Sequence, residues 1–527
     1  MGESIAALVA VSLVAADVSG ETVTYRLLES ARAYGRARLV DLAELEQVSR
    51  RHAEYFLTYF QSASVRSSGW SSLQWVEAYK SQLDNLRAAL DWASSSREWR
   101  LRDALTTVAV PLLTHLSLNE ECRSRVQSAL SDRPAGLAPD AQFEVQLLAG
   151  LGMSLLYTSG GGPKAYEAWR DCLSAAEKNC DIDYQLRAIG SMWSVSFREG
   201  KMREVRRLHE RFEALAGLSP SVEDALHAKR MHAIEMFYYG QFKEACKYQR
   251  EVYEAYLKGG YSMDVLRFRI DQTVLACVNL SKTLWVLGFP DHAKTIASRS
   301  VEIAQNVHHD ISTAYALAYS ACRISVITGD FLAAETYIEN LLEISVVDQN
   351  GPWKYFGLCW KGALLSRQGD ATGAATILSE ALVGVPEGSF GMHHTRFLGE
   401  LAYADAGAGN VAAGLAHIGK AIELCERLDE QWFLAELIRL EGEIILIGGG
   451  PGANIAARDR FTRSLALAKR QGALSFELRA ATSLARLGFD DGNGTSVQVL
   501  GEIYGRFTEG FGTSDLIRAR TILESSA

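Results

Sequence analysis

The chain contains only 9 prolines among its 527 residues. Proline interrupts helix interiors and cannot donate to a strand ladder, so its scarcity leaves long helices possible almost everywhere. Alanine, leucine, arginine and glutamate, which favour helix, are abundant. We therefore expect an all-α protein, apart from a short segment at the N-terminus.

Cysteine pairs, excess basic charge and long apolar runs are also missing. The 8 cysteines are scattered without a Cys-x-x-Cys pair, which predicts reduced thiols. The 54 basic residues are outnumbered by 63 acidic ones, so we expect no direct nucleic-acid contact. No window holds about 18 consecutive apolar residues, which predicts no membrane span and a cytoplasmic location.

Residue patterns for catalysis, cofactors and metals are absent as well. The string nearest to a phosphate loop, Gly288 to Thr295, has Ala293 where the second glycine is needed, and Pro290 removes a backbone donor. The pairs His308–His309 and His393–His394 have no ligand neighbours, and we expect exposed loop histidines. We therefore predict no enzyme activity, no cofactor and no metal.

What the sequence does contain is a ladder of glycines, each between two apolar helical runs. They are Gly160, Gly200, Gly240, Gly288, Gly329, Gly369, Gly409, Gly449 and Gly488. Neighbours are 39 to 41 residues apart, except for one interval of 48. A period of this size is typical of a solenoid in which one pair of helices is stacked many times, with the glycine in the turn.

Two columns of small residues accompany the glycines. Seven residues before the turn come Ala233, Ser281, Cys322, Gly362, Ala402, Gly442 and Ala481, and five residues after it come Ala165, Ala245, Ala293, Ala334, Ala374 and Gly414. Large apolar residues follow nine positions after the turn, at Trp169, Ile338, Leu378 and Ile418. Small residues at both places predict close approach of two antiparallel helices, with the large residues filling the space.

This pattern resembles the tetratricopeptide repeat, whose helix hairpins carry small residues and a large apolar residue at similar places. The usual period of that family is shorter, about 34 residues. The resemblance implies a right-handed helix-hairpin solenoid with repeats of about 40 residues, and other helical-repeat assignments stay open.

The N-terminus has a different pattern. Residues 5–14 read as a brief helix, and residues 15–28 as a β-hairpin turning at residues 19–21. A helix followed by a hairpin is typical of the latter half of a winged helix.

The chain also resembles the region that follows the winged helix in bacterial signal-transduction ATPases, a family of winged-helix transcriptional regulators. The residues that carry this resemblance are 8–14, 25–34, 51–56, 84–92, 472–486 and 504–511. The resemblance implies a DNA-binding and ATPase module encoded upstream. No position in this chain matches the residues of that module.

These patterns divide the chain into four parts. We predict a winged-helix remnant at 1–28, an N-terminal helical region at 29–139, the repeat solenoid at 140–490 and capping helices at 491–527. Within the second part, helices are expected at 29–61, 70–96 and 99–131, and the last helix of the chain at 515–523.

The resemblance to tetratricopeptide repeats also implies a concave groove lined by the first helix of each pair. The repeat positions that face the groove in that family correspond here to Arg187, Phe197, His227, Arg230, Phe237, Lys282, Tyr319, Arg323, Arg396 and Tyr403, with Glu436, Arg439 and Glu443 farther along. Arginine and aromatic residues are common anchors for partners. We predict a non-catalytic scaffold of a signal-transduction ATPase that binds a protein or peptide partner, or a small anionic effector. A free-standing adaptor unrelated to transcription, or an ordinary solvated surface, remains the alternative.

Overall fold

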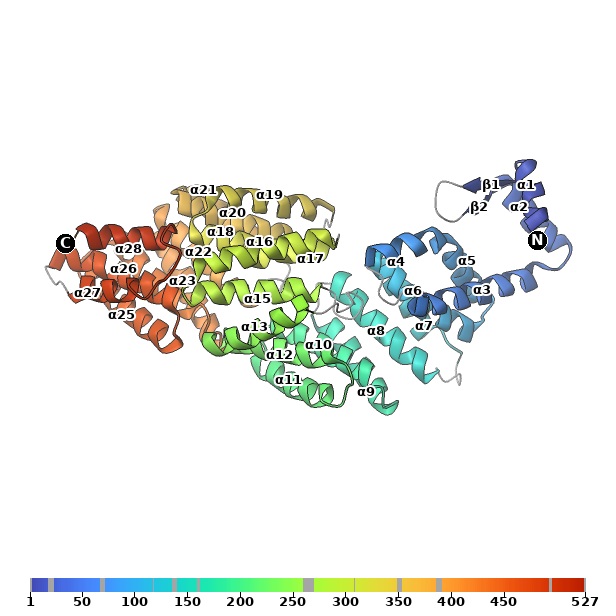
Figure 1. Cartoon of the computed structure of the whole chain (residues 1–527), viewed down its shortest axis with the longest axis horizontal. Helices are drawn as coiled ribbons and strands as arrows, with labels where there is room; N and C mark the ends of the chain where they lie inside the picture. The colour runs from blue at the N-terminus through green and yellow to red at the C-terminus, as the bar shows by residue number, and fades with distance from the viewer. Residues whose placement is uncertain are drawn as a thin grey trace.

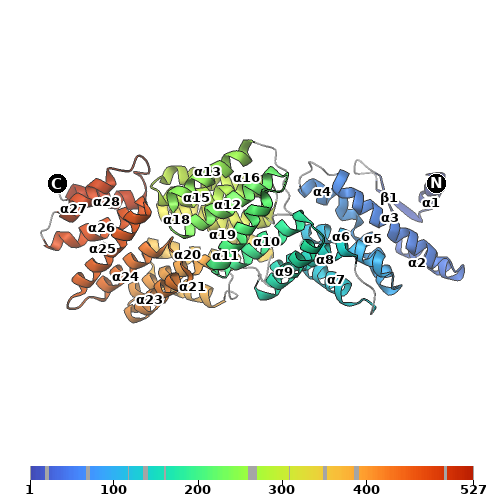
Figure 2. The same ribbon diagram turned by 90° about the horizontal axis from the view of Figure 1, so that it is seen from below.

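The computed structural model describes residues 2–17, 23–66, 72–116, 118–134, 140–158, 162–258, 270–307, 309–347, 353–384, 391–491 and 495–525. Most of the described residues lie in helices. The molecule is elongated, with the two termini at opposite ends (Figures 1 and 2). The prediction of an all-α, right-handed, tetratricopeptide-like solenoid with a small N-terminal hairpin is confirmed. None of the described helices combines the length and apolar content needed to cross a membrane.

The solenoid consists of antiparallel helix pairs. The first four pairs are α8 (Ala141–Thr158) with α9 (Pro163–Lys178), α10 (Ile182–Arg198) with α11 (Met202–Ala216), α12 (Val222–Tyr238) with α13 (Phe242–Lys258), and α15 (Gln272–Val286) with α16 (Pro290–Asn306). In the fifth pair the first helix is divided into α17 (Asp310–Ala316), η2 (Leu317–Ala321) and α18 (Cys322–Thr328), and it is followed by α19 (Phe331–Val347). The last three pairs are α20 (Trp353–Gln368) with α21 (Ala371–Gly384), α22 (His394–Gly407, preceded by the short η3, Gly391–His393) with α23 (Val411–Leu428), and α24 (Leu434–Gly448) with α25 (Ala453–Gln471). At the C-terminal end follow α26 (Leu474–Asp491), α27 (Thr495–Tyr504) and α28 (Ser514–Ser525).

The turn glycines behave as the sequence predicts, with one exception. From Gly200 to Gly449, each of the seven glycines lies between the two helices of a pair and has a positive φ, from 64° to 95°. Only glycine adopts this conformation without strain. Gly160 lies outside the described residues. The prediction for Gly488 is wrong, because α26 continues through it to Asp491.

The small residues allow the two helices of a pair to approach closely, as predicted. A Cβ added at Gly362 would lie 2.6 Å from Cγ of Leu378, so the large residue of the second helix fills the space over the small residue of the first. A Cβ added at Gly414 would lie 2.7 Å from the carbonyl oxygen of Ala402 on the facing helix. Because that obstacle is backbone, it cannot rotate away.

Gly414→Ala should therefore destabilise the protein, by about 1–3 kcal/mol, because α22 and α23 must move apart. The matched control is Gly419→Ala in the same helix, where an added Cβ would meet nothing within 4 Å. That change should stabilise the helix by up to about 1 kcal/mol. Urea denaturation of both variants measures the difference, and equal effects would show that the helix contact is not as close as described.

The turns also contact helices much later in the chain. A Cβ added at Gly240 would lie 2.5 Å from Nε2 of Gln471, and one at Gly288 would lie 2.6 Å from Cδ2 of Leu474. Ser475 Oγ donates a 2.5 Å hydrogen bond to the carbonyl of Trp285, 190 residues earlier. The solenoid thus winds back on itself, so that the pairs α10–α19 lie against η3 and the helices from α22 onward. We call these two parts the first and second coil.

The N-terminal module consists of α1 (Gly2–Ala10), β1 (Val14–Asp17), β2 (Thr24–Leu27) and α2 (Glu29–Asp41). The two strands pair antiparallel, with Val14 opposite Leu27, which confirms the predicted hairpin. Its expected turn at 19–21 lies outside the described residues. The helix is shorter than predicted, because the chain leaves it after Ala10 and enters β1 at Val14.

The next region is helical, but each of the three predicted helices is divided in two. They are α2 and α3 (Leu45–Arg66), then α4 (Ser72–Tyr79) and α5 (Leu83–Ser95) with the short η1 (Lys80–Gln82) between them, then α6 (Trp99–His115) and α7 (Asn119–Ser131). Ala43 at the first break has a φ of 55°. These breaks allow α3, α5 and α6 to fold onto one core containing Phe56, Leu90 and Leu105. The last helix of the chain, Ser514–Ser525, extends slightly beyond the predicted 515–523.

Candidate functional site: a cationic cavity between the two coils

The largest group of predicted site residues surrounds a cavity of about 180 Å³. Its walls come from α8, α10, α11, α12, α15, the α17–η2 segment and η3. Helices α10, α12 and α15 each contribute side chains spaced three or four residues apart, so one face of each helix points into the cavity. The predicted residues that line it are Arg187, Phe197, His227, Arg230, Lys282 and Tyr319.

The other predicted residues lie elsewhere. Phe237, Arg323 and Arg396 are almost fully buried and line neither this cavity nor the next one described, so in this structure they are not exposed to a partner. Tyr403 lines a second cavity together with Arg439 and Glu443. The predicted groove residues are thus divided among two of the described cavities and a set of buried side chains.

The separating wall consists of stacked cations and aromatic rings from both coils. The guanidinium of Arg323 lies 4.6 Å from the ring centroid of Trp432, and that of Arg396 lies 4.4 Å from the ring of Trp360. The phenol of Tyr238 lies 3.2 Å from Nε2 of His393. The expectation that His393 is an exposed loop residue is wrong, since it is buried between the coils.

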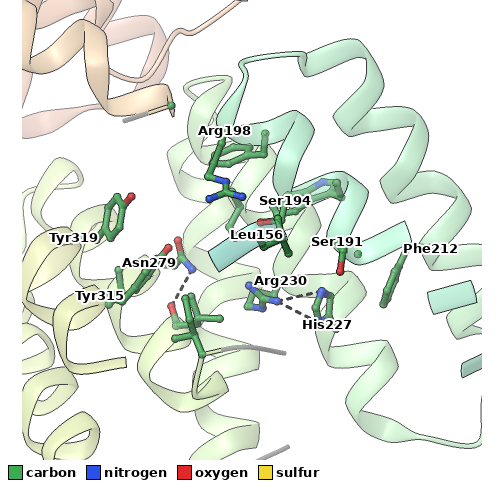
Figure 3. A pocket seen from close by; sticks show the side chains of 18 of the residues that line it. Leu156, Ser191, Ser194, Arg198, Phe212, His227, Arg230, Asn279, Tyr315 and Tyr319 are labelled. Atoms are coloured by element: carbon green, nitrogen blue, oxygen red, sulfur yellow. Dashed lines mark hydrogen bonds between the residues drawn. The ribbon is translucent and has the colours of Figure 1, made fainter. Parts of the chain in front are cut away.

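Arg230 is the cation in the middle of the cavity lining, as Figure 3 shows. Its Nη2 atom lies 3.2 Å from the ring nitrogens of His227, and its buried Nε has no hydrogen-bond partner in the described structure. Burial lowers the pKa of the Arg230 guanidinium, and no carboxylate is among the groups that affect it. A buried guanidinium without an acid is costly unless an anion binds it.

Lys282 is a second buried cation in the lining. Its Nζ lies 4.6 Å from the centroid of the Phe237 ring and 5.1 Å from that of Tyr238. Burial lowers the pKa of the Lys282 ammonium well below its usual value, and the charge of Arg323 lowers it further. Within the described residues, no carboxylate lies within ion-pair distance of it.

The carboxyl group of Glu430, in the wall beside Trp432, does not supply the missing charge. Burial raises the pKa of Glu430 to about 8, even though Thr395 and Trp432 donate hydrogen bonds to it. At neutral pH this group is therefore mostly protonated and neutral. Among the lining residues, the cations Arg187, Arg198, Arg230 and Lys282 outnumber the acidic side chains.

Tyrosines on the α17–η2 segment form the wall opposite Phe212 (Figure 3). The rings of Tyr315 and Tyr319 are in contact, with centroids 4.4 Å apart and planes tilted by 38°. Tyr319 lies in η2, one turn of π-helix, a type of turn that often occurs at functional sites. The sequence reasoning missed Tyr315, although its spacing of four residues from Tyr319 places both on one helix face. It also missed Arg198 and His393, which no repeat offset selects.

The lining of the cavity contains more cationic than acidic side chains. The described residues contain no group of three or more His, Cys, Asp or Glu side chains placed to hold a metal ion. Asp224 is the one carboxylate among the described lining residues, and its Oδ2 accepts a 2.6 Å hydrogen bond from Ser219. The arrangement suits an anion, because cationic donors outnumber this single acid.

Searches for similar proteins returned solved structures only. No model of a protein family matches the sequence, and no curated protein matches it. The apo form of the quorum sensor NprR from B. thuringiensis is 12% identical, with 69% of this chain and 99% of that chain covered and a TM-score of 0.41. The Rap protein complexed with competence and sporulation factor is 12% identical, with 81% and 100% covered and a TM-score of 0.39.

A third similar structure is the APC/C hetero-tetramer Cut9–Hcn1, 12% identical, with 95% of this chain and 96% of that chain covered and a TM-score of 0.40. All three likenesses are in the overall course of the helices. At these TM-scores they assign no ligand or partner to this chain.

Proposed function

We propose that this chain is a non-catalytic, effector-sensing interaction scaffold of a signal-transduction ATPase or winged-helix transcriptional regulator. The observation that supports this most is the cavity between the coils, where Arg230 and Lys282 are buried without an acid. Burying uncompensated charge reduces stability, so its presence in a cavity favours a binding role. An anionic effector would bind there, and the repeats would carry the protein contacts.

The N-terminal module supports a link to a further domain. Among the described side chains of residues 5–42, only Val14 is a buried hydrophobic residue. Large apolar side chains that remain exposed are Leu8, Val11, Leu13, Val23, Tyr25, Leu27, Leu28, Tyr34, Val40 and Leu42. Apolar residues gathered this densely are typical of an interaction surface. We propose that 1–28 is a winged-helix remnant, 29–139 a helical connection, 140–490 the sensor solenoid and 491–527 its cap.

The test is association with the ATPase module that we expect to be encoded upstream. The two proteins should co-purify, and changing Tyr25, Leu27 and Tyr34 together to serine should weaken their affinity at least 10-fold, because it removes the apolar contact. The matched control changes Leu332 and Ile455, both 78% exposed but on the solenoid, to serine. Affinity is measured by surface plasmon resonance.

Two results would contradict this proposal. If the ATPase module does not bind, or binds the triple-serine variant equally well, a free-standing adaptor becomes the better description. If millimolar ATP alone raises the Tm of this chain, the chain has a nucleotide site that the proposal does not include.

A further inference from the structure

We propose that the cavity between the coils binds a small organic anion, with its single acidic group between Arg230 and Lys282 and its apolar body against Phe197, Tyr315 and Tyr319. This inference rests on the proposed sensing role and names the class of effector. It follows from three features of the cavity: its charges, its walls and the packing that bounds it toward the second coil.

The first feature is the set of charges in the lining. Arg187 is paired with Asp183, with Nε and Oδ2 2.8 Å apart, and needs no further anion. Arg230 and Lys282 are 8% and 5% exposed and have no acidic partner among the described residues. Two buried donors suit one carboxylate or phosphate group.

The second feature is the apolar part of the lining. It consists of aliphatic residues and the rings of Phe197, Tyr315 and Tyr319, and it lies among polar groups such as Ser191, Ser194 and Asn279. Leu156, Leu186, Ile234, Leu275 and Val278 are the aliphatic members. Trp193 stacks on Phe197 with an interplanar angle of 7° and holds that ring in place. Such walls favour an aromatic or branched aliphatic body, with a few polar contacts fixing its orientation.

The third feature is that the cavity does not continue as a groove. Gly391 of the second coil packs against Arg198 of the first, where an added Cβ would lie 2.8 Å from the Arg198 carbonyl oxygen. Along the axis of the solenoid, Arg323 and Trp432 fill the space. An extended peptide would have no path through this wall. The cavity therefore favours a small molecule over an acidic peptide segment.

The experiment measures binding of phenylacetate and naphthalene-2-carboxylate to the full-length chain by isothermal titration calorimetry. Their neutral amides serve as matched ligands without charge. We expect at least one acid to bind, at least 10-fold more tightly than its amide, because charge-assisted hydrogen bonds supply much of the affinity. Equal binding of acid and amide, or no binding of either acid, would overturn the proposal.

Variants then locate the site. Arg230→Gln and Lys282→Met should each weaken binding of the acid about 10- to 100-fold, whereas Arg187→Gln, which removes a paired cation from the same lining, should change it less than about threefold. Lys282→Met should also raise the Tm, because it removes a buried charge, so lost binding in that variant cannot come from unfolding. Should it fail to fold, Lys282→Gln replaces it.

Two further outcomes would count against the inference. One is undiminished binding in both Arg230→Gln and Lys282→Met. The other is an acidic hexapeptide that displaces the aromatic acid and binds more tightly, which would make a peptide the occupant. Neither result depends on association with the ATPase module, so this inference and the proposed function can fail separately.

Discussion

Glu436→Gln is expected to lower the free energy of unfolding by about 3 kcal/mol, the lower end of the cost of breaking a buried ion pair. Glu436 is 1% exposed, and its carboxylate accepts a 2.8 Å hydrogen bond from Nη2 of Arg439 and a 3.0 Å bond from Nη1 of Arg479. The amide of glutamine removes the negative charge and leaves both cations buried. They keep Glu443 and Asp515 as partners, which limits the loss.

The same residue predicts how stability depends on pH. Burial alone would raise the pKa of Glu436, but the charges of Arg439 and Arg479 outweigh burial and lower it to about 2. A lowered folded-state pKa means that this stabilisation is complete above the unfolded pKa, about 4.3, and is lost as pH falls toward 2. Wild type should lose this contribution over that range, whereas Glu436→Gln should lack it at every pH.

Urea denaturation between pH 7 and pH 2.5 measures both effects. The matched control is Glu441→Gln in the same helix, whose carboxylate pairs with Arg460 and is about one-fifth exposed. A partly exposed pair contributes little, so the control should change stability by less than about 1 kcal/mol. Equal effects of the two substitutions would mean that the Glu436 cluster is not a buried structural element.

Trp432→Ala is expected to cost about 3–5 kcal/mol, the usual range for deleting a fully buried tryptophan. Trp432 is fully buried in the wall between the coils. Its ring centroid lies 5.6 Å from Phe237, 5.9 Å from Tyr238 and 4.9 Å from Phe433. Removing it leaves Arg323 without its ring and opens a void where the first and second coils meet.

The effect should be on shape as well as on stability. Because local helix pairing does not depend on Trp432, the helical circular dichroism signal should be kept at low temperature while small-angle X-ray scattering shows a larger radius of gyration. Leu332→Ala is the control, since Leu332 is 78% exposed and its loss should change neither quantity. An unchanged Tm and radius in Trp432→Ala would show that the coils are held together elsewhere.

The repeat architecture could be predicted from the sequence because a helix pair is a local structure. The turn glycine and the small residues at Gly362 and Gly414 act within one hairpin, so their spacing is visible in the chain. Helix ends were harder to predict. Gly488 lies inside α26 because a single helical glycine costs only about 1 kcal/mol, which packing of that helix offsets. The break at Ala43 depends on folding of α3 onto α5 and α6, which no local pattern records.

The candidate site could also be predicted in part, because the repeat pattern that locates its residues is local in the sequence. Repeat offsets identify which face of a helix points inward, and six of the ten predicted residues line the central cavity. They do not show how far the solenoid winds before its coils meet. Contacts between the two coils bury Arg323 and Arg396 and bring His393 beside Tyr238. The residues in contact are far apart in the chain: 155 positions separate Tyr238 from His393, and 190 separate Trp285 from Ser475.

The sequence by itself thus determined the helix pair, its glycine turn and its period, because these depend on backbone conformation and on side-chain size over about forty residues. The tertiary structure alone decided that a wall of buried cations and aromatic rings forms where the two coils meet. The physical reason is that small rotations between successive pairs add up along the solenoid. Only the accumulated rotation brings the two coils into contact, and that contact removes the cations of the wall from water.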